Sequence, residues 1–338
     1  MRRTLRLIST AFGVLIWTAA ALAAPPHVTL EEFVEIPARS FAGDQPVQGV
    51  SSIAPGPGRN LWWALSDNGY GTRENSGGYV LSIYLFEIAS RATLLERLTL
   101  RDPNHLFPWP LTRKDDAART FTGADADPES MVVMPDGSFW LGEELGPWLL
   151  HFSRLGELLE PPVLPPLPAG VTLRVSRGFE GLAPGPAPGT LVAMLEGAMP
   201  GDAPDVLRLF EFDLASKKWT GRFWLYPLDA PSHSGCELVR AGDHHLIIER
   251  DDREGDAAKF KRIFAVQFGT ETRLVKNLVV DLLAIDNPKG LGDGASTFRF
   301  PFITTESVWP IDAHTLEVVN DNNYPSGDPT QWIRLRLE

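Results

Sequence analysis

The sequence predicts an all-β fold, a β-propeller of about six blades with about four antiparallel strands each. Short apolar or alternating runs of roughly four to eight residues recur along the chain, and apolar residues at helical spacing are scarce. The 30 glycines and 29 prolines supply turns between these runs. Regular alternation of strands and helices, which a doubly wound sheet or an α/β barrel requires, is missing. A two-stranded pattern also repeats along the chain, as described below.

The start of the chain differs from the rest. A basic stretch with three arginines precedes an apolar run from Leu7 to Leu22, and Ala21-Leu22-Ala23 resembles a cleavage site. These features are typical of a secretory signal, whose apolar run is too short for a stable membrane span. We therefore predict a signal peptide over residues 1–23 and a single propeller domain over residues 24–338. The mature protein is expected to be periplasmic or secreted, with no membrane span, and the export route stays open.

The charge of the chain restricts its partners. The formal net charge is −12 at pH 7, and loss of the three leader arginines takes it to about −15. A protein this acidic is a poor partner for nucleic acid or for an anionic membrane surface. A cation, or a small anionic substrate approached through a cation, fits this charge better. The chain has a single cysteine, Cys236, so an intramolecular disulfide is excluded. Separately, we expect the protein to be a monomer.

Copies of one two-stranded repeat support the propeller prediction. A copy starts with a polar residue, a small residue and an apolar strand, as in Glu129-Ser130-Met131-Val132, and ends on polar or acidic residues, as in Glu143-Glu144. The copies begin at residues 51, 129, 180 and 306, and a weaker copy begins at 237. Repeats of roughly 40 to 50 residues are typical of propeller blades, which leads to about six blades and an insertion over residues 104–120. The alternative is a chance recurrence of hairpins.

The repeat also predicts a metal site. In an antiparallel hairpin the start of the first strand and the end of the second lie at the same edge, so the acidic residues of all blades would meet at one mouth. Crowded carboxylates either hold protons or bind a cation, and oxygen ligands suit calcium. The seven histidines and one cysteine show no spacing typical of zinc sites. The predicted calcium ligands are Asp67, Glu129, Glu180, Glu306 and Asp321, with the amide oxygens of Asn68, Asn320 and Asn322 as further candidates. Taken singly, each acid is better explained as a solvated turn residue, and the metal site is predicted from the acids as a group.

Four further residues are candidates for catalysis. Arg177 and Arg250 lie next to acidic residues in the sequence. Such arginines usually form structural ion pairs, but at a mouth that binds calcium they can grip an anionic ester. Glu143 or Glu144 is the candidate general base, if burial raises its affinity for protons. The sequence contains no Gly-x-Ser-x-Gly elbow, phosphate loop or dinucleotide fingerprint.

Several of these motifs, taken in order, resemble a known family. The segments 127–130 (Asp-Pro-Glu-Ser), 143–147 (Glu-Glu-Leu-Gly-Pro), 177–183 (Arg-Gly-Phe-Glu-Gly-Leu-Ala) and 320–323 (Asn-Asp-Asn-Asn) are similar to blocks of the phytase-like domain family, also described as esterase-like activity of phytase. The resemblance covers most of the chain and implies a propeller, export and a calcium-dependent phosphoesterase. The sequence departs from the family at Asn68, where many relatives carry Arg.

Together, these observations predict an exported, calcium-dependent phosphoester hydrolase that acts on a small phosphorylated substrate. Two alternatives stay open. The first is a non-catalytic propeller that binds a ligand or a protein and holds a structural metal, because one fold hosts many functions. The second is a metal-dependent lactonase or carboxylester hydrolase of the same shape.

Overall fold

The computed structural model describes residues 27–37, 41–42, 45–174, 176–322 and 328–338. The predicted signal peptide, residues 1–23, lies outside these residues. The described chain is all-β, as predicted, with two short 3-10 helices, η1 (Ser76–Gly78) and η2 (Gly255–Ala257). None of the helices in this part of the chain has the length and apolar character needed to cross a membrane.

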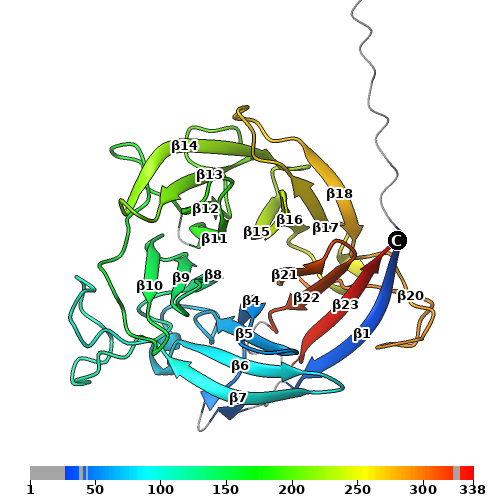
Figure 1. Ribbon diagram of the computed structural model, residues 1–338, viewed down its shortest axis with the longest axis horizontal. Helices are drawn as coiled ribbons and strands as arrows, with labels where there is room; N and C mark the ends of the chain where they lie inside the picture. Colours follow the sequence, from blue (N-terminus) through cyan, green and yellow to red (C-terminus); the bar gives the residue numbers. More distant parts are fainter. Residues whose placement is uncertain (1–26, 38–40, 43–44, 175, 323–327) are drawn as a thin grey trace, which may run out of the picture.

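The described strands form five blades around a central axis (Figure 1). Blade 1 contains β4 (Val50–Pro55), β5 (Leu61–Ser66), β6 (Ser82–Ile88) and β7 (Ala92–Thr99). Blade 2 contains β8 (Pro128–Val133), β9 (Phe139–Glu143) and β10 (Leu149–Phe152). Blade 3 contains β11 (Phe179–Pro184), β12 (Thr190–Leu195), β13 (Val206–Asp213) and β14 (Lys218–Pro227). Blade 4 contains β15 (His233–Ala241), β16 (His244–Asp251), β17 (Lys261–Val266) and β18 (Lys276–Asp281).

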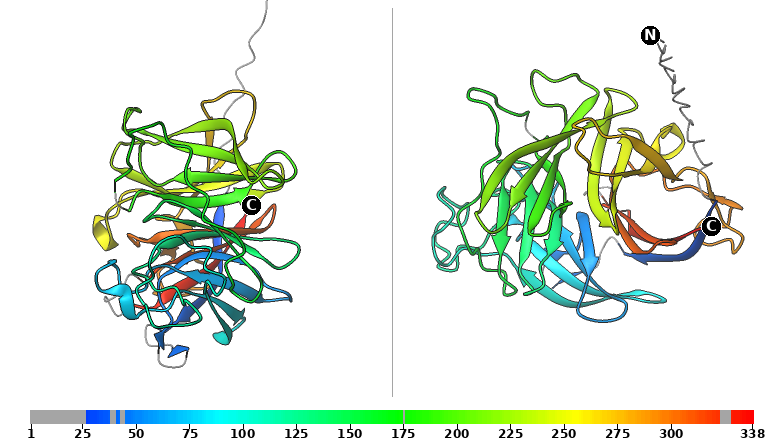
Figure 2. Two further views of the ribbon diagram at one scale, coloured as in Figure 1. Left: turned by 90° about the vertical axis from the view of Figure 1, so that its left-hand side faces the viewer. Right: turned by 45° about the horizontal axis from the view of Figure 1, so that its top comes forward.

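Blade 5 joins the two ends of the described chain. It contains β21 (Thr305–Asp312), β22 (Thr315–Asn320), β23 (Thr330–Leu337) and β1 (Val28–Ile36), with β19 (Ile285–Asp286) and β20 (Thr297–Phe298) at its outer edge. Strand β1 runs antiparallel to β23, from Val28 opposite Leu337 to Ile36 opposite Thr330. This pairing closes the ring, which Figure 2 shows in two further views. A small separate ribbon pairs β2 (Phe41–Ala42) with β3 (Gln45–Pro46).

The prediction of a β-propeller is confirmed, but the prediction of about six blades was wrong. The described residues form five blades, and blade 2 has three strands rather than four. The reason is that long connections consume residues without building blades. Residues 100–127, which include the predicted insertion, and the described residues within 153–178 contain isolated bridges rather than strands. Dividing the chain length by a standard repeat length therefore overestimates the number of blades.

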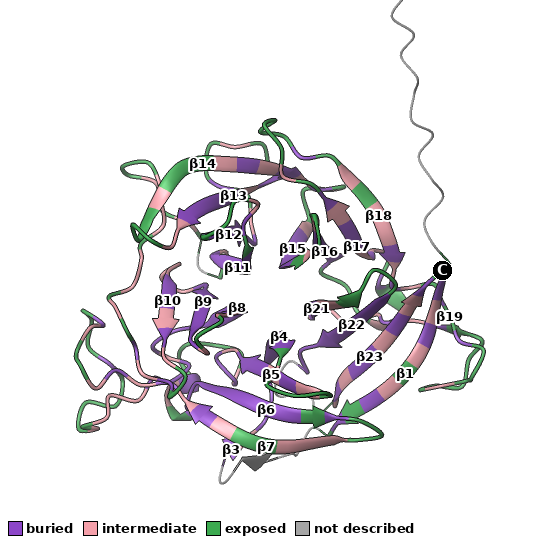
Figure 3. Cartoon of the chain, viewed as in Figure 1, coloured by how far each residue is buried: buried purple, intermediate pink, exposed green. Residues whose placement is uncertain are grey.

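Apolar packing between blades holds the ring together. Five clusters of buried hydrophobic side chains lie at the five interfaces between neighbouring blades. Trp62 of blade 1 packs edge-on against Trp332 of blade 5 with ring centroids 5.4 Å apart, and Trp140 of blade 2 meets Phe212 of blade 3 at 5.3 Å. Figure 3 shows the inner strands mostly buried and the outer strands β7, β14 and β18 partly exposed. The inner strands are therefore rigid supports for side chains near the axis.

Candidate functional site

A β-bulge occurs at the same position in the innermost strand of every blade. The ladder between the first and second strand shifts register at Ser51, Glu129, Glu180, Cys236 and Glu306. A bulge places two residues opposite one and redirects a side chain. The fourth copy of the repeat therefore begins at Cys236, one residue before the predicted start. Three of the five bulge residues are glutamates, and all three line one cavity near the axis.

A second equivalent position lies at the end of the second strand of each blade or directly after it. In four blades the backbone N–H of this residue donates a hydrogen bond, at 2.8 to 3.0 Å, to the backbone carbonyl of the residue just before the first strand. The four residues are Asp67, Glu144, Glu196 and Asp321. In blade 4 the same position is taken by Arg250, which is paired with Ser234. Because the backbone geometry is the same in each blade, these side chains are directed to the same cavity. The predicted convergence of strand starts and strand ends is thus present in the structure.

This cavity, the mouth, has a volume of about 400 Å³ and is strongly acidic. Nine carboxyl groups and two arginines line it, which leaves a formal excess of seven negative charges. The charged lining residues are Asp67, Asp127, Glu129, Glu144, Glu180, Glu196, Asp252, Glu306, Asp321, Arg177 and Arg250. All five predicted calcium ligands are therefore brought together here, as are three of the four residues predicted for catalysis.

Glu143 is the predicted catalytic residue that the structure does not place in the mouth. Its buried carboxylate accepts hydrogen bonds from the backbone amides of Leu145, Gly146 and Trp148 at 3.0, 2.6 and 3.0 Å. Successive residues of a strand point to opposite sides, so when Glu144 faces the mouth Glu143 lies behind it. Burial raises the pKa of Glu143 to about 8. Its position indicates that Glu143 orders the loop after β9.

The three candidate amide ligands have structural partners instead. The side-chain oxygen of Asn68 accepts hydrogen bonds from the amide of Gly71 and the hydroxyl of Ser76. The side-chain oxygen of Asn320 accepts from the amide of Gln331, and that of Asn322 from the amide of Gly49. These oxygens are engaged in holding loops at the rim, so the carboxylates are the oxygens available to a cation.

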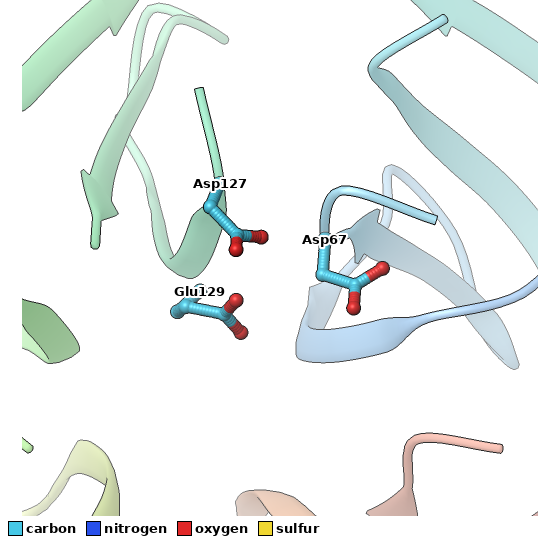
Figure 4. Close-up of side chains that lie close together, drawn as sticks. All are labelled: Asp67, Asp127 and Glu129. Atoms are coloured by element: carbon cyan, nitrogen blue, oxygen red, sulfur yellow. The ribbon is translucent and has the colours of Figure 1, made fainter. Parts of the chain in front are cut away.

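Three carboxylates at one side of the mouth form a compact cluster. One oxygen each of Asp67, Asp127 and Glu129 lies within 4.8 Å of the other two. Figure 4 shows Asp127 and Glu129 of blade 2 extending their carboxyl groups toward the segment of blade 1 that carries Asp67. Asn68 ties the two blades together, because its backbone N–H and its amide group donate to the two oxygens of Asp127 at 2.9 and 2.7 Å. Asp127 was not among the predicted ligands, although it belongs to the Asp-Pro-Glu-Ser motif.

The cluster has the electrostatics of a cation site. Burial raises the pKa of Glu129 well above its ordinary value, and the nearby charges of Asp127 and Glu180 raise it further. Burial, together with Asp321 and Asp127, has the same effect on Asp67. Without a counter-ion these groups are driven to hold protons near neutral pH, because charged carboxylates would repel one another in a poorly solvated place. A cation bound among the carboxylates would offset this repulsion and allow them to stay charged.

The two arginines differ in how tightly the protein holds them. Arg250 is 7% exposed, donates to Asp252 at 2.7 Å and lies 3.5 Å from Glu306. The side chain of Arg177 is 33% exposed, forms an ion pair with Glu196 at 2.6 Å and donates to Ser234 at 2.9 Å. Arg250 is therefore part of the buried framework, while Arg177 lies at the rim.

This difference predicts unequal costs of removal. We expect Arg250→Gln to lower the free energy of unfolding by about 3 kcal/mol, because it leaves buried carboxylates without a positive partner. Arg177→Gln should cost about 1 kcal/mol or less, because its ion pair is partly exposed. Urea unfolding of both variants in the same buffer measures the difference. Equal losses would show that Arg250 has no special structural role.

A family model for phytase-like proteins, described as esterase-like activity of phytase, matches residues 45–324. The chain belongs to the phytase-like family. The match includes every charged residue of the mouth, and it confirms the resemblance drawn from the sequence motifs. No curated protein matches this phytase-like chain in sequence.

Solved structures that are similar to this protein are distant from it in sequence. A GH43 β-1,3-galactosidase shares 11% identity with this phytase-like protein at a TM-score of 0.51, over 89% of this chain and 60% of that one. An exo-β-1,3-galactanase from Phanerochaete chrysosporium shares 9% identity at a TM-score of 0.50, over 89% of this chain and 64% of that one. An arabinanase from Bacillus subtilis shares 13% identity at a TM-score of 0.43, over 83% and 91%. Likeness at this level concerns the fold alone.

Proposed function

We propose that this phytase-like propeller is an exported, calcium-dependent phosphoester hydrolase that acts on a small phosphorylated substrate. The carboxylate cluster of Asp67, Asp127 and Glu129, at one side of a cavity that also contains two arginines, is the observation that carries the proposal. The family description, which names an esterase-like activity of phytase, agrees with ester hydrolysis. The signal-like segment over residues 1–23 supports export.

The donor set favours calcium over a transition metal. No His or Cys occurs among the described residues that line the mouth, so every anionic group that could bind a metal there is a carboxylate. Calcium accepts six to eight oxygen ligands in a flexible geometry, whereas zinc prefers nitrogen and sulfur. In addition, one buried oxygen of Glu180 has no hydrogen-bond partner in the described part of the chain. This carboxylate oxygen of Glu180 is therefore available as a further ligand for a cation in the mouth.

The residues of the mouth can divide the work of hydrolysis. Asp67, Asp127 and Glu129 would hold calcium, and calcium bound there would neutralise charge on a substrate phosphate and make a nearby water more acidic. Arg177 at the rim can exchange part of its contact with Glu196 for a phosphate oxygen. Glu144 is mostly buried, and burial raises its pKa well above the ordinary value, which suits a group that accepts a proton from the attacking water.

Removal of calcium tests the proposal. We expect hydrolysis of p-nitrophenyl phosphate or of phytate in calcium, a loss of at least about 100-fold after calcium removal with EGTA, and recovery when calcium is returned in excess. A panel of phosphomonoesters assayed under the three conditions measures this. Phosphatase activity that is unchanged by EGTA would contradict the role of calcium.

The same samples separate the two alternatives. Turnover of lactones or carboxylesters without turnover of phosphoesters would favour the second hydrolase class. A rise of Tm in calcium without turnover of any ester would favour a propeller that binds a partner and holds a structural metal, because a ligand that binds the folded state stabilises it.

A further inference from the structure

The connection over residues 100–127 is built around a pair of stacked tryptophans. The ring centroids of Trp109 and Trp148 lie 4.3 Å apart, and their planes are inclined by 13°. Trp109 belongs to the connection, whereas Trp148 lies between β9 and β10 of blade 2. In Figure 1 the connection reaches beyond the ring at the lower left, beside blades 1 and 2. This pair, the aromatic stack, joins the connection to blade 2.

One face of Trp109 is open. The ring of Phe107 lies edge-on to both indoles, with its centroid 5.0 Å from that of Trp109 and 5.3 Å from that of Trp148. Because these distances are nearly equal, Phe107 lies beside the stack and does not cover the outer face of Trp109. Trp109 is 38% exposed, and its indole N–H has no hydrogen-bond partner among the described residues. The outer face and the N–H are therefore both available to a ligand.

A buried carboxylate fixes the part of the connection that carries Trp109. Asp102 is fully buried, and its oxygens accept hydrogen bonds from the amides of Leu106 and Phe107 at 2.8 and 3.0 Å. Arg119, beyond Trp109 in the sequence, donates to Asp102 at 3.0 Å and to the carbonyl of Phe107 at 3.0 Å. These bonds tie the two sides of the connection together, so Trp109 is presented on an ordered segment.

Prolines on both sides restrict Trp109 further. Pro108 and Pro110 are exposed like Trp109 itself. A proline ring fixes its own backbone φ and limits the conformation of the residue before it. Binding costs less when the contacting group is already ordered. A rigid, exposed indole is therefore well suited to anchor a ligand.

A cavity beside Trp109 adds polar groups. It has a volume of about 450 Å³, and Pro110 is part of its lining. His105, Lys114 and Asp115 line it as well, and all three are exposed. Within the described ranges their side chains have neither a hydrogen bond nor an ion pair. Together they offer both donors and acceptors next to the flat face of the indole.

A sugar ring matches this combination. One face of a pyranose consists of C–H groups, and the negative face of an indole attracts such positively polarised hydrogens. The hydroxyl groups at the edge of the sugar both donate and accept hydrogen bonds, so they can pair with Lys114 and Asp115. An aryl ring would use the flat face alone and leave the polar groups of the cavity without partners.

The aromatic stack is connected to the rim of the mouth by short segments. Trp148 is four residues after Glu144, which places the two Cα atoms at most about 14 Å apart. On the other side, the amide and the hydroxyl of Thr112 both donate to Asp125 at 2.7 Å. Asp125 is two residues before Asp127 of the carboxylate cluster. A molecule on the stack is therefore held on the side of the mouth where the cluster lies.

We propose that the exposed face of Trp109 stacks on a sugar ring, and that the protein binds glycans at the aromatic stack. This binding does not depend on hydrolysis in the mouth. Together with the proposed function, on which this extension rests, it makes the substrate a phosphorylated glycan. Trp109 then holds a sugar that does not react.

Saturation-transfer NMR tests the sugar contact without phosphate or calcium. The probes are the methyl glycosides of glucose, galactose and N-acetylglucosamine, with sorbitol as an open-chain control and benzyl alcohol as an aryl control. We expect the ring protons of at least one glycoside to receive saturation from the wild type, and sorbitol to receive none. Equal transfer to sorbitol, or transfer to benzyl alcohol alone, would overturn the assignment to sugar.

Two variants identify the residue. Trp109→Leu should raise the Kd of the glycoside about fivefold or more, because it removes the flat face, while Trp109→Phe keeps an aromatic face and most of the affinity. Trp109 is exposed, so both variants are expected to fold like the wild type, and their Tm values check this. A wild type that binds no glycoside would overturn the proposal, as would a Trp109→Leu variant with unchanged affinity. Glycan binding without phosphoester turnover would contradict the hydrolase function alone, and turnover without glycan binding would contradict the sugar site alone.

Discussion

Glu129→Gln is expected to abolish calcium-dependent activity and the stabilisation of the fold by calcium. Glutamine has the shape of glutamate but removes one of the three charges of the cluster of Asp67, Asp127 and Glu129. Charge stabilisation by a metal is worth several kcal/mol in the transition state, so we expect kcat/KM to fall by about 100-fold or more. Assays of phosphoester hydrolysis and of Tm, each with and without calcium, measure both effects.

A matched variant separates the metal site from general effects of charge. Glu87→Gln makes the same chemical change at an exposed position of β6, and it should leave both the activity and the calcium-induced rise of Tm unchanged. A Glu129→Gln protein that still gains the full rise of Tm in calcium would show that calcium binds elsewhere, and the cluster would then lose its assigned role.

The parts of the fold that depend on local pattern could be predicted from the sequence. Alternating apolar runs and turn residues indicate strands, and the repeat of polar strand ends indicates inner hairpins that share an edge. The number of blades could not be obtained in this way. It depends on connections such as residues 100–127 and 153–178, whose described residues form isolated bridges but add no strands to the ring. The sequences of these connections do not indicate how many residues belong to each blade.

The site was predicted in outline, and its details depend on register. The sequence places Glu143 and Glu144 side by side and does not indicate which one faces the mouth. In the structure the bulge at Glu129 and the pairing of Glu144 with Asp127 set this choice. Asp127 itself was missed because it precedes the strand, and its role comes from a contact with Asn68 of another blade. Such contacts between distant parts of the chain have no signal in one sequence.

In calcium-free buffer, we expect the free energy of unfolding to fall as the pH rises from about 5 to about 8. Burial raises the pKa of Glu306 from an ordinary value near 4.5 to about 7, although Arg250 opposes the shift. Between these two values the folded protein holds a proton that the unfolded chain has lost, so stability decreases with rising pH. One pKa unit corresponds to about 1.4 kcal/mol, and Glu306 alone then contributes about 3 kcal/mol, or a Tm change on the order of 10 °C.

Under the proposed function calcium should reverse this trend, because a metal ion binds carboxylates in the form that has lost its proton. The rise of Tm on addition of calcium is therefore expected to be larger at pH 8 than at pH 5. Thermal unfolding across this range, with protein stripped of calcium beforehand and with Glu306→Gln alongside, isolates the contribution of the mouth from that of other groups. The variant should show a shallower decline in the absence of calcium, since a glutamine cannot titrate. If the calcium-free wild type keeps the same stability from pH 5 to pH 8, the carboxylates of the mouth are already charged together without a cation, and their crowding gives no reason to propose a calcium site.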